Sequence, residues 1–380
     1  TNLDRILKAY PKYGQFAQKF VQKRLGFKPP KTGNAFDPHR CFDEVNSEEY
    51  YGHSFDVVGI DPNDTNYLRA FSNALKEAPR KLSANDVKSI TETLTEGVPL
   101  ILRKLNALRF CKQYSNAKSP LRVAQKIKDE CLVFMQGRSL KSSYANAYGH
   151  YKNDLFAQLC RDSKKARGGV PYAGFETFIT MSSGNPRNLL IILGKAYEIA
   201  AFRELDFING SPLSIALQTE AAIEAAHFMY ERDTNYGSES DLARGATERL
   251  ALVLRTARYA LNIPEVSPLA VSFSEEELSP NARAVLNYAL NYSLVFEVYD
   301  GRPDRNSQRV QKKIQLNPLL SPKWGLPIGR RGDISLSAAL VNAIFDSTKQ
   351  GDFNILLNAL DLKWNHPFGV SSNLTQVDLF

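Results

Sequence analysis

The stretch SSGNPRNLLIIL, residues 182–193, has the pattern of one helix ending and another beginning. Asn185 is a good N-cap, and Pro186 suits the first helical position. Arg187 then falls in the first turn, where the helix dipole is positive and a cation is unfavourable by about 0.3–1 kcal/mol. Two interpretations stay open: Arg187 reaches an acidic neighbour or water, or an anion such as a nucleotide phosphate shares this helix end with it.

Helical patterns extend to both sides of this turn. The helix that begins at Pro186 has apolar residues on nearly every side, which predicts that it is mostly buried. One amphipathic helix, or two broken near Pro11, is predicted over residues 1–27, and FDVVGIDP at residues 55–62 predicts a short buried strand. Further helices are predicted over residues 66–75, 83–95, 97–114, 120–135, 143–168, 212–233 and 240–262.

The pattern changes towards the C-terminus. Residues 263–279, with their prolines and capping serines, predict a loop. A helix over 280–293 is followed by a strand at 294–299, a turn and a return strand at 308–316, and then by a helix at 337–345 and an irregular tail. A helix followed by a hairpin is the ending of a winged helix-turn-helix domain, which the two preceding helices would complete. The expected fold class is therefore mainly α, with an α+β C-terminal part.

The helix over 280–293 has a face suited to reading bases. Arg283, Asn287 and Asn291 recur every four residues and line one side, while the opposite side is apolar. Arg and Asn pair with guanine and adenine edges in the major groove, although a solvated stripe has the same pattern. A group of cations that could contact backbone phosphates follows it, and a solubilising loop or a docking surface for an acidic partner is the alternative. This basic group comprises Arg302, Arg305, Arg309, Lys312, Lys313, Lys323, Arg330 and Arg331.

Composition limits the class of protein. The chain has 380 residues and a formal net charge of +8, with basic and acidic blocks alternating along it, as expected for patches that meet phosphates or neighbouring domains. Its longest apolar stretch is too short and too charged to span a bilayer, and the N-terminus has no secretory apolar core. Four cysteines without CxxC spacing argue against zinc and disulfides and favour the cytoplasm.

Catalytic motifs are scarce. The phosphate-binding pattern G-x-x-x-x-G-K-[ST] is absent, so we expect no ATP hydrolysis by this chain alone. The five histidines share no metal-ligand spacing, and no nucleophile-base arrangement is visible. We therefore predict no catalytic residue and no metal site within the chain.

GFETFITMSSGNPRNLLIILGKAY, residues 174–197, resembles the lid-helix segment of prokaryotic AAA+ and STAND-type ATPases related to origin-recognition initiators. In that family a Gly-x-x-Arg at the start of a lid helix is a second sensor whose arginine reaches the terminal phosphate of the nucleotide. The resemblance assigns this role to Gly184 and Arg187, with Asn185 and Pro186 between them. It extends over residues 140–345, because VSFSEEELSPNARAVLNYALNYSLVFEV and KIQLNPLLSPKWGLPIGRRGDISLS resemble the family's DNA-binding winged helix.

The resemblance implies a domain order and a set of partners. Residues 1–100 would form an N-terminal segment with a remnant core strand, 101–210 a helical lid, 211–345 the winged helix and 346–380 a tail. ATP and Mg²⁺ would come only with a core domain supplied upstream or by a partner, since the family's phosphate-binding loop is not evident here. The chain would then be the C-terminal portion of a larger ATPase, or a variant that lost its catalytic core.

The leading hypothesis is thus a nucleotide-responsive DNA-binding module, with phage defence or mobile-element biology suggested by the resemblance alone. Its partners would be duplex DNA, an ATPase core and a further copy of the chain, without a membrane. The alternative is a non-catalytic module that uses a winged helix for protein contacts or oligomerisation.

Overall fold

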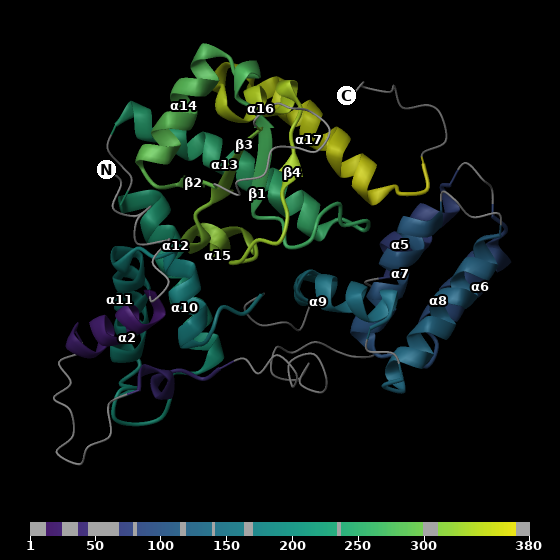
Figure 1. Ribbon diagram of the computed structural model, residues 1–380, viewed down its shortest axis with the longest axis horizontal. Coiled ribbons are helices and arrows are strands. Elements are labelled where there is room, and N and C mark those ends of the chain that lie inside the picture. Colours follow the sequence, from purple (N-terminus) through teal and green to yellow (C-terminus); the bar gives the residue numbers. More distant parts are fainter. Residues whose placement is uncertain are drawn as a thin grey trace.

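The computed structural model describes residues 13–24, 37–44, 68–78, 82–114, 119–138, 141–162, 170–233, 237–298 and 311–369. This part of the chain is mainly helical, with a small mixed sheet, so the expected mainly α class is confirmed (Figure 1). Among the residues described, no helix is long and apolar enough to cross a membrane.

One group of helices packs around its own buried cluster, on the right of Figure 1. A capping box starts one of these helices, with Ser83 Oγ accepting from the Asp86 amide at 3.0 Å. Large apolar side chains such as Phe71, Ile90 and Phe110 fill this cluster, which also takes in Phe368 from the far end of the chain. The helices are α5 (Arg69–Lys76), α6 (Ala84–Thr95), α7 (Leu100–Tyr114), α8 (Pro120–Met135) and α9 (Ser143–Asp162).

A second buried cluster lies under the remaining elements. Its first helices are α2 (Tyr13–Arg24), η1 (Pro38–Cys41), α10 (Phe175–Ser182), α11 (Pro186–Phe202), α12 (Ile215–Phe228), which continues as the π turn η3 (Met229–Asp233), and α13 (Ser238–Tyr259). Those that follow are η4 (Glu275–Glu277), α14 (Pro280–Asn291), η5 (Pro318–Leu320), α15 (Ser321–Trp324), α16 (Ala338–Phe345), η6 (Ser347–Lys349) and α17 (Gln350–Asn365).

The sheet runs in the order β2-β3-β1-β4 and lies against the helices of the second cluster (Figure 1). Its strands are β1 (Ala270–Ser274), β2 (Val295–Glu297), β3 (Gln311–Leu316) and β4 (Ile334–Ser335). β3 is antiparallel to both neighbours, with Ala270 opposite Gln315 and Val295 opposite Leu316. β4 pairs with β1 in parallel.

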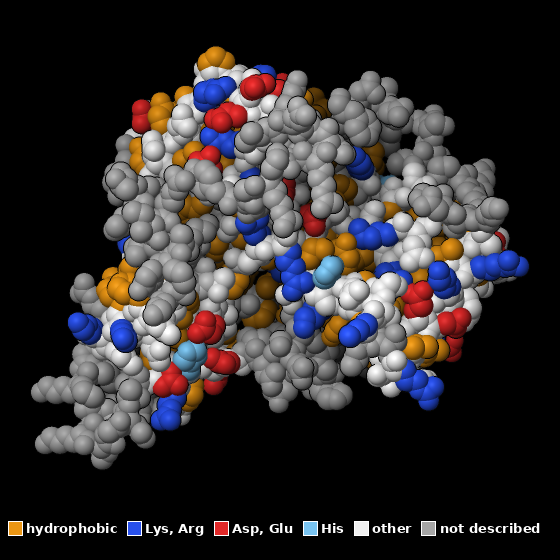
Figure 2. All heavy atoms as spheres, viewed as in Figure 1, with side chains coloured by type: hydrophobic (Ala, Val, Ile, Leu, Met, Phe, Trp, Pro, Cys, Tyr) orange, Lys and Arg blue, Asp and Glu red, His pale blue; other side chains and the backbone are white. Residues whose placement is uncertain are grey.

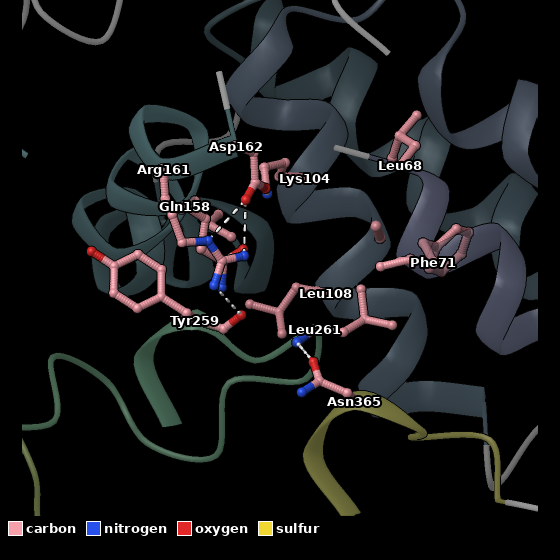
Figure 3. Close-up of a pocket in the computed structure, with 13 residues that line it drawn as sticks. Leu68, Phe71, Lys104, Leu108, Gln158, Arg161, Asp162, Tyr259, Leu261 and Asn365 are labelled. Carbon is pink, nitrogen blue, oxygen red and sulfur yellow. Dashed lines mark hydrogen bonds and ion pairs between the residues drawn. The ribbon is translucent and has the colours of Figure 1, made fainter. Parts of the chain in front are cut away.

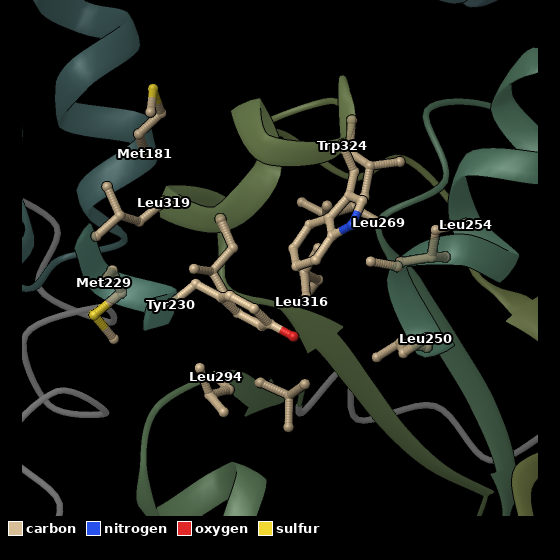
Figure 4. Close-up of a cluster of buried hydrophobic side chains, with 14 of the residues drawn as sticks. Met181, Met229, Tyr230, Leu250, Leu254, Leu269, Leu294, Leu316, Leu319 and Trp324 are labelled. Carbon is tan, nitrogen blue, oxygen red and sulfur yellow. The ribbon is translucent and has the colours of Figure 1, made fainter. Parts of the chain in front are cut away.

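Side chains from distant segments meet in the second cluster (Figure 4). The Trp324 ring from α15 meets the Tyr230 ring from η3 edge-on, with centroids 5.4 Å apart. Leu250 and Leu254 from α13 and Leu316 from β3 are fully buried around them. Apolar burial at about 25 cal/mol per Å² therefore ties α13, the sheet and α15 into one packed unit.

Three expectations need correction. Residues 270–274 form β1 rather than a loop, because ladder bonds to β3 override the local turn signals. The predicted irregular tail contains α17, which buries Phe353 and Trp364. The α11 helix is not buried on all sides: Tyr197 and Phe202 are 56% and 87% exposed, since the core covers one face only.

Other expectations lie outside the described residues. These are the strand at 55–62, the turn with the strand ends at residues 299–310, and the basic end of the helix that we extended to residue 168. The predicted domain boundaries stay predictions.

Candidate functional site

The turn before α11 has the caps expected from its sequence. Asn185 Oδ1 accepts from the Arg187 amide at 2.9 Å, and Pro186 occupies the first helical turn. Ser183 and Gly184 both adopt positive φ, at 53° and 78°, and this reverses the chain between α10 and α11. Glycine takes such a φ without steric cost, so Gly184 has a backbone role here.

The inner side of this turn is held by buried polar contacts. Tyr13 Oη from α2 lies 2.9 Å from Ser182 Oγ, and Asn188 Nδ2 donates to the Ser182 carbonyl at 3.3 Å. Burial raises the pKa of Tyr13, so its hydroxyl stays protonated at neutral pH. Because these contacts fix the turn from inside, the exposed Arg187 side chain is presented at the surface of the helix N-terminus.

The α14 helix has the two faces expected from its sequence. Arg283, Asn287 and Asn291 are exposed, whereas Ala282, Val285, Leu286 and Ala289 are buried against the second cluster. Ser279 caps the helix by accepting from the Ala282 amide at 3.1 Å. The structure therefore brings the three predicted base-reading residues into one solvent-facing row.

An acidic residue lies between this row and the hairpin. Arg283 Nη2 donates to the Glu275 carbonyl at 2.9 Å, and Lys312 Nζ lies 2.8 Å from Glu275 Oε1. Glu275 thus joins one cation from α14 to one from β3. The expected charge of this surface is reduced, and nothing in the local sequence signalled the pairing because Glu275 and Lys312 are 37 residues apart.

The other cations of the basic group that the structure describes lie on separate elements. Lys313 Nζ lies 2.7 Å from Asp333 Oδ1. Lys323 contacts the end of α12 and η3. Its Nζ lies 3.4 Å from Glu231 Oε1 and 4.8 Å from the centre of the Tyr230 ring. Arg330 and Arg331 line a cavity beside α9 and α10. Arg302, Arg305 and Arg309 lie outside the described residues.

A buried ion pair that our sequence reasoning missed joins the two clusters. Arg258 Nε on α13 lies 3.1 Å from Asp154 Oδ1 on α9, and the side chains are 4% and 0% exposed. The Ser267 amide also donates to Asp154, at 2.8 Å. Burial raises the pKa of Asp154 although Arg258 opposes this, and the pKa of Arg258 is raised because its acidic and phenolic neighbours outweigh its own burial. The sequence signal that could have indicated this ion pair is an Asp on the apolar face of a predicted helix.

A smaller cavity of about 70 Å³ lies at the same junction (Figure 3). Lys104 Nζ from α7 lies 3.0 Å from Asp162 Oδ2, and Arg161 Nη2 lies 2.8 Å from Asp162 Oδ1. Burial lowers the pKa of Lys104, whereas the two cations hold the pKa of Asp162 below its usual range in spite of burial. The space suits about two water molecules, so we assign this cavity a structural role.

Comparison with known proteins places the chain in a family. No curated protein and no solved structure matches it. The model of the ORC-CDC6-like family matches residues 1–336, which is most of the chain and includes the turn at Arg187, α14 and the sheet. This match confirms the resemblance to origin-recognition-related AAA+ ATPases noted from residues 140–345. The chain belongs to the ORC-CDC6-like family.

Proposed function

We propose that this chain is the nucleotide-responsive, DNA-binding portion of an AAA+ type ATPase that works in the cytoplasm. The observation that carries the DNA-binding part is the exposed row of Arg283, Asn287 and Asn291 on α14, next to the antiparallel β2–β3 pair. Membership of the ORC-CDC6-like family supports the ATPase-related context.

The chain order supports a winged-helix interpretation of this region. Strand β1 lies between α13 and α14 and pairs with β3, so β2, β3 and β1 make an antiparallel sheet. The short η4 turn occupies the place where a second helix would precede the recognition helix. In this interpretation α14 enters the major groove, and the hairpin contacts phosphates.

Glu275 allows a sharp test, because it neutralises two of the proposed contacts. We expect Glu275→Gln to tighten binding of a fluorescent duplex and to steepen its salt dependence, since Arg283 and Lys312 both become available to phosphates. Glu276→Gln is the matched control: it removes the same charge from the same exposed turn, but its carboxylate has no ion pair among the described residues.

Fluorescence anisotropy across a salt series measures the outcome. Arg283→Ala should weaken binding, and Arg305→Ala with Lys312→Ala should weaken it on all sequences and lower the salt slope by about one per lost contact. DNA binding through α14 and the hairpin would be refuted by two results together. Glu275→Gln and Glu276→Gln would bind the duplex with equal affinity, and neither Arg283→Ala nor Arg305→Ala with Lys312→Ala would lose affinity.

The nucleotide-sensing part depends on Arg187. Its exposed position at the N-terminus of a capped helix suits a phosphate offered from outside, where backbone amides and a guanidinium can bind together. ATP and Mg²⁺ enter only with a core supplied upstream or by a partner. In an assembly that contains this core, Arg187→Ala should abolish the ATP-dependent change in DNA affinity, whereas Arg203→Ala, an exposed arginine paired with Glu220, should not.

One observation favours the alternative of an interaction module. Leu190 and Tyr197, seven residues apart, are exposed on the same face of α11, and Phe202 at the end of the helix is 87% exposed; exposed apolar groups of this kind are typical of contact surfaces. If no duplex binds in low salt and Tyr197→Ser changes the oligomeric state, this alternative replaces the DNA proposal. A role in phage defence or mobile-element biology rests on the resemblance, and plaque counts with and without the gene test it.

A further inference from the structure

The end of α17 bridges the two buried clusters. Trp364 belongs to the second cluster, and Phe368, four residues later, belongs to the first. In Figure 1 α17 runs from the elements around the sheet towards the side that carries α5 and α7. We call residues 364–368 the strap. The match to the ORC-CDC6-like family ends at residue 336, so the strap lies beyond the matched part of the chain.

The Phe368 ring makes the contact between the strap and the first cluster. This side chain is 7% exposed. The ring meets those of Phe71, Phe110 and Tyr114 edge-on, with centroids 6.0, 6.0 and 4.6 Å away. Edge-to-face pairs of this kind favour one orientation of the rings over others. A single side chain therefore holds the end of the strap in a defined place between α5 and α7.

Polar contacts on either side of this ring are few. Asn365 Oδ1 accepts from the Leu261 amide at 2.9 Å, in the chain that follows α13 (Figure 3). His366 Nδ1 lies 3.3 Å from Glu77 Oε2, just after α5, and both side chains are partly exposed. Each contact involves one side chain of the strap, so the strap can detach without unfolding either cluster.

Another connection between the clusters is the contact of α9 with the end of α13. The buried pair of Asp154 and Arg258 lies here. Gln158 Nε2 also donates to the carbonyls of Arg258 and Ala260, at 3.0 and 2.9 Å. Because these bonds are buried and several hold the same two segments, we expect this contact to persist when the strap detaches. It would then act as a pivot.

Space for movement lies beside the pivot. A cavity of about 480 Å³ separates α9 from α10 and from the loop 326–331. In Figure 2 the surface is hollowed at this place, between the side that carries α10 and the side that carries α9. Arg331 reaches across its edge and donates to the Gly149 carbonyl at 2.9 Å, a contact that a long side chain can keep over a range of separations. α9 can therefore approach α10 without displacing packed side chains.

A pivot, a space and a removable contact together make a two-state device. We propose that the strap is a latch: when Phe368 leaves the aromatic cluster, the first group of helices rotates about the contact of α9 with α13 and closes the cavity. A rotation of about 15° moves a point about 20 Å from the pivot by about 5 Å. This proposal goes beyond DNA and nucleotide binding and is tested without either ligand.

Distances between two spin labels in the full chain measure this movement. The labels are placed on Lys126→Cys in α8 and Ala201→Cys in α11, which are exposed positions, whereas the cysteines of the natural sequence are all buried. With the strap intact we expect one narrow distance distribution. Phe368→Ala should shift or broaden it by about 5 Å. Ile355→Ala, which removes an exposed apolar side chain from α17 itself, should leave it unchanged.

A second variant separates opening of the latch from unfolding. Asn365→Ala removes the bond to the Leu261 amide but keeps the Phe368 ring, so it should produce a smaller shift in the same direction. Helical circular dichroism should be retained in both variants, because each cluster stays folded. The proposal is overturned if neither variant changes the distances. It is also overturned if Phe368→Ala loses helical signal, since the strap is then an inseparable part of the core.

Discussion

Replacing Arg258 with methionine should be one of the most damaging single changes in this chain. Arg258→Met leaves the Asp154 carboxylate, which is fully buried, with the Ser267 amide as its remaining donor. Breaking a buried pair in this way costs about 3–5 kcal/mol. The lost hydrogen bond from Arg258 to the Gly325 carbonyl is of the order of 1 kcal/mol and is included in that range.

The loss should depend on pH in a defined direction. An acid whose pKa is raised in the folded state destabilises the fold as the pH rises above its unfolded value, about 3.9 for Asp. Without Arg258 the pKa of Asp154 rises further, so the deficit of Arg258→Met should be larger near pH 8 than near pH 5. Adding Asp154→Asn should recover part of the loss, because an amide needs no counterion.

Urea unfolding followed by two probes measures these effects. Tryptophan fluorescence reports on the second cluster, since Trp324 and Trp364 both lie in it, while circular dichroism reports on all helices. Arg255→Met, an exposed arginine on the same helix, is the control and should cost less than about 1 kcal/mol. A loss below about 1 kcal/mol for Arg258→Met, with no pH dependence, would refute the view that this pair joins the two clusters.

Three further predictions concern single residues. Asn185→Ala should lower the free energy of unfolding by about 1 kcal/mol, seen as a lower melting temperature, because α11 loses its cap. Gly325→Ala should cost about 1–3 kcal/mol in urea unfolding, since φ is 66° and the added Cβ would lie 2.6 Å from Tyr259 Oη. The pKa of Asp346 is lowered, since hydrogen bonds from Thr348 outweigh the effect of burial. The Asp346 carboxylate therefore stabilises the fold above about pH 4 and loses this effect below it. The midpoint urea concentration of Asp346→Ala should approach that of the wild type as the solution is acidified. The last prediction fails if the difference is constant with pH.

Local signals in the sequence predicted the helices and their caps well. The bounds of α8 were predicted as observed, and those of α6, α7 and α16 to within three residues at either end. The exposed row on α14 followed from helical periodicity alone. Caps, prolines and a 3.6-residue repeat act over one or two helical turns, so neighbouring residues are sufficient to predict these features.

The predictions that failed depend on partners far along the chain. β1 becomes a strand because it pairs with β3, and α17 is fixed by burying Phe353 and Trp364 in a core made by other segments. The partners of Lys313 and Lys323 likewise come from other elements, since the first meets Asp333 and the second Glu231. No local pattern encodes such distances.

The sequence by itself determined where helices start and stop, which face of α14 is polar, and that a cation follows the Asn185 cap. Tertiary structure decided which charges are neutralised, since Glu275 meets Lys312 and Asp154 meets Arg258 only after the chain has folded. It also created the cavity at Arg330 and Arg331 by bringing α9, α10 and the loop 326–331 together. The physical reason is that Coulomb energy and packing depend on separation in space, which residues more than a hundred positions apart acquire only in the folded state.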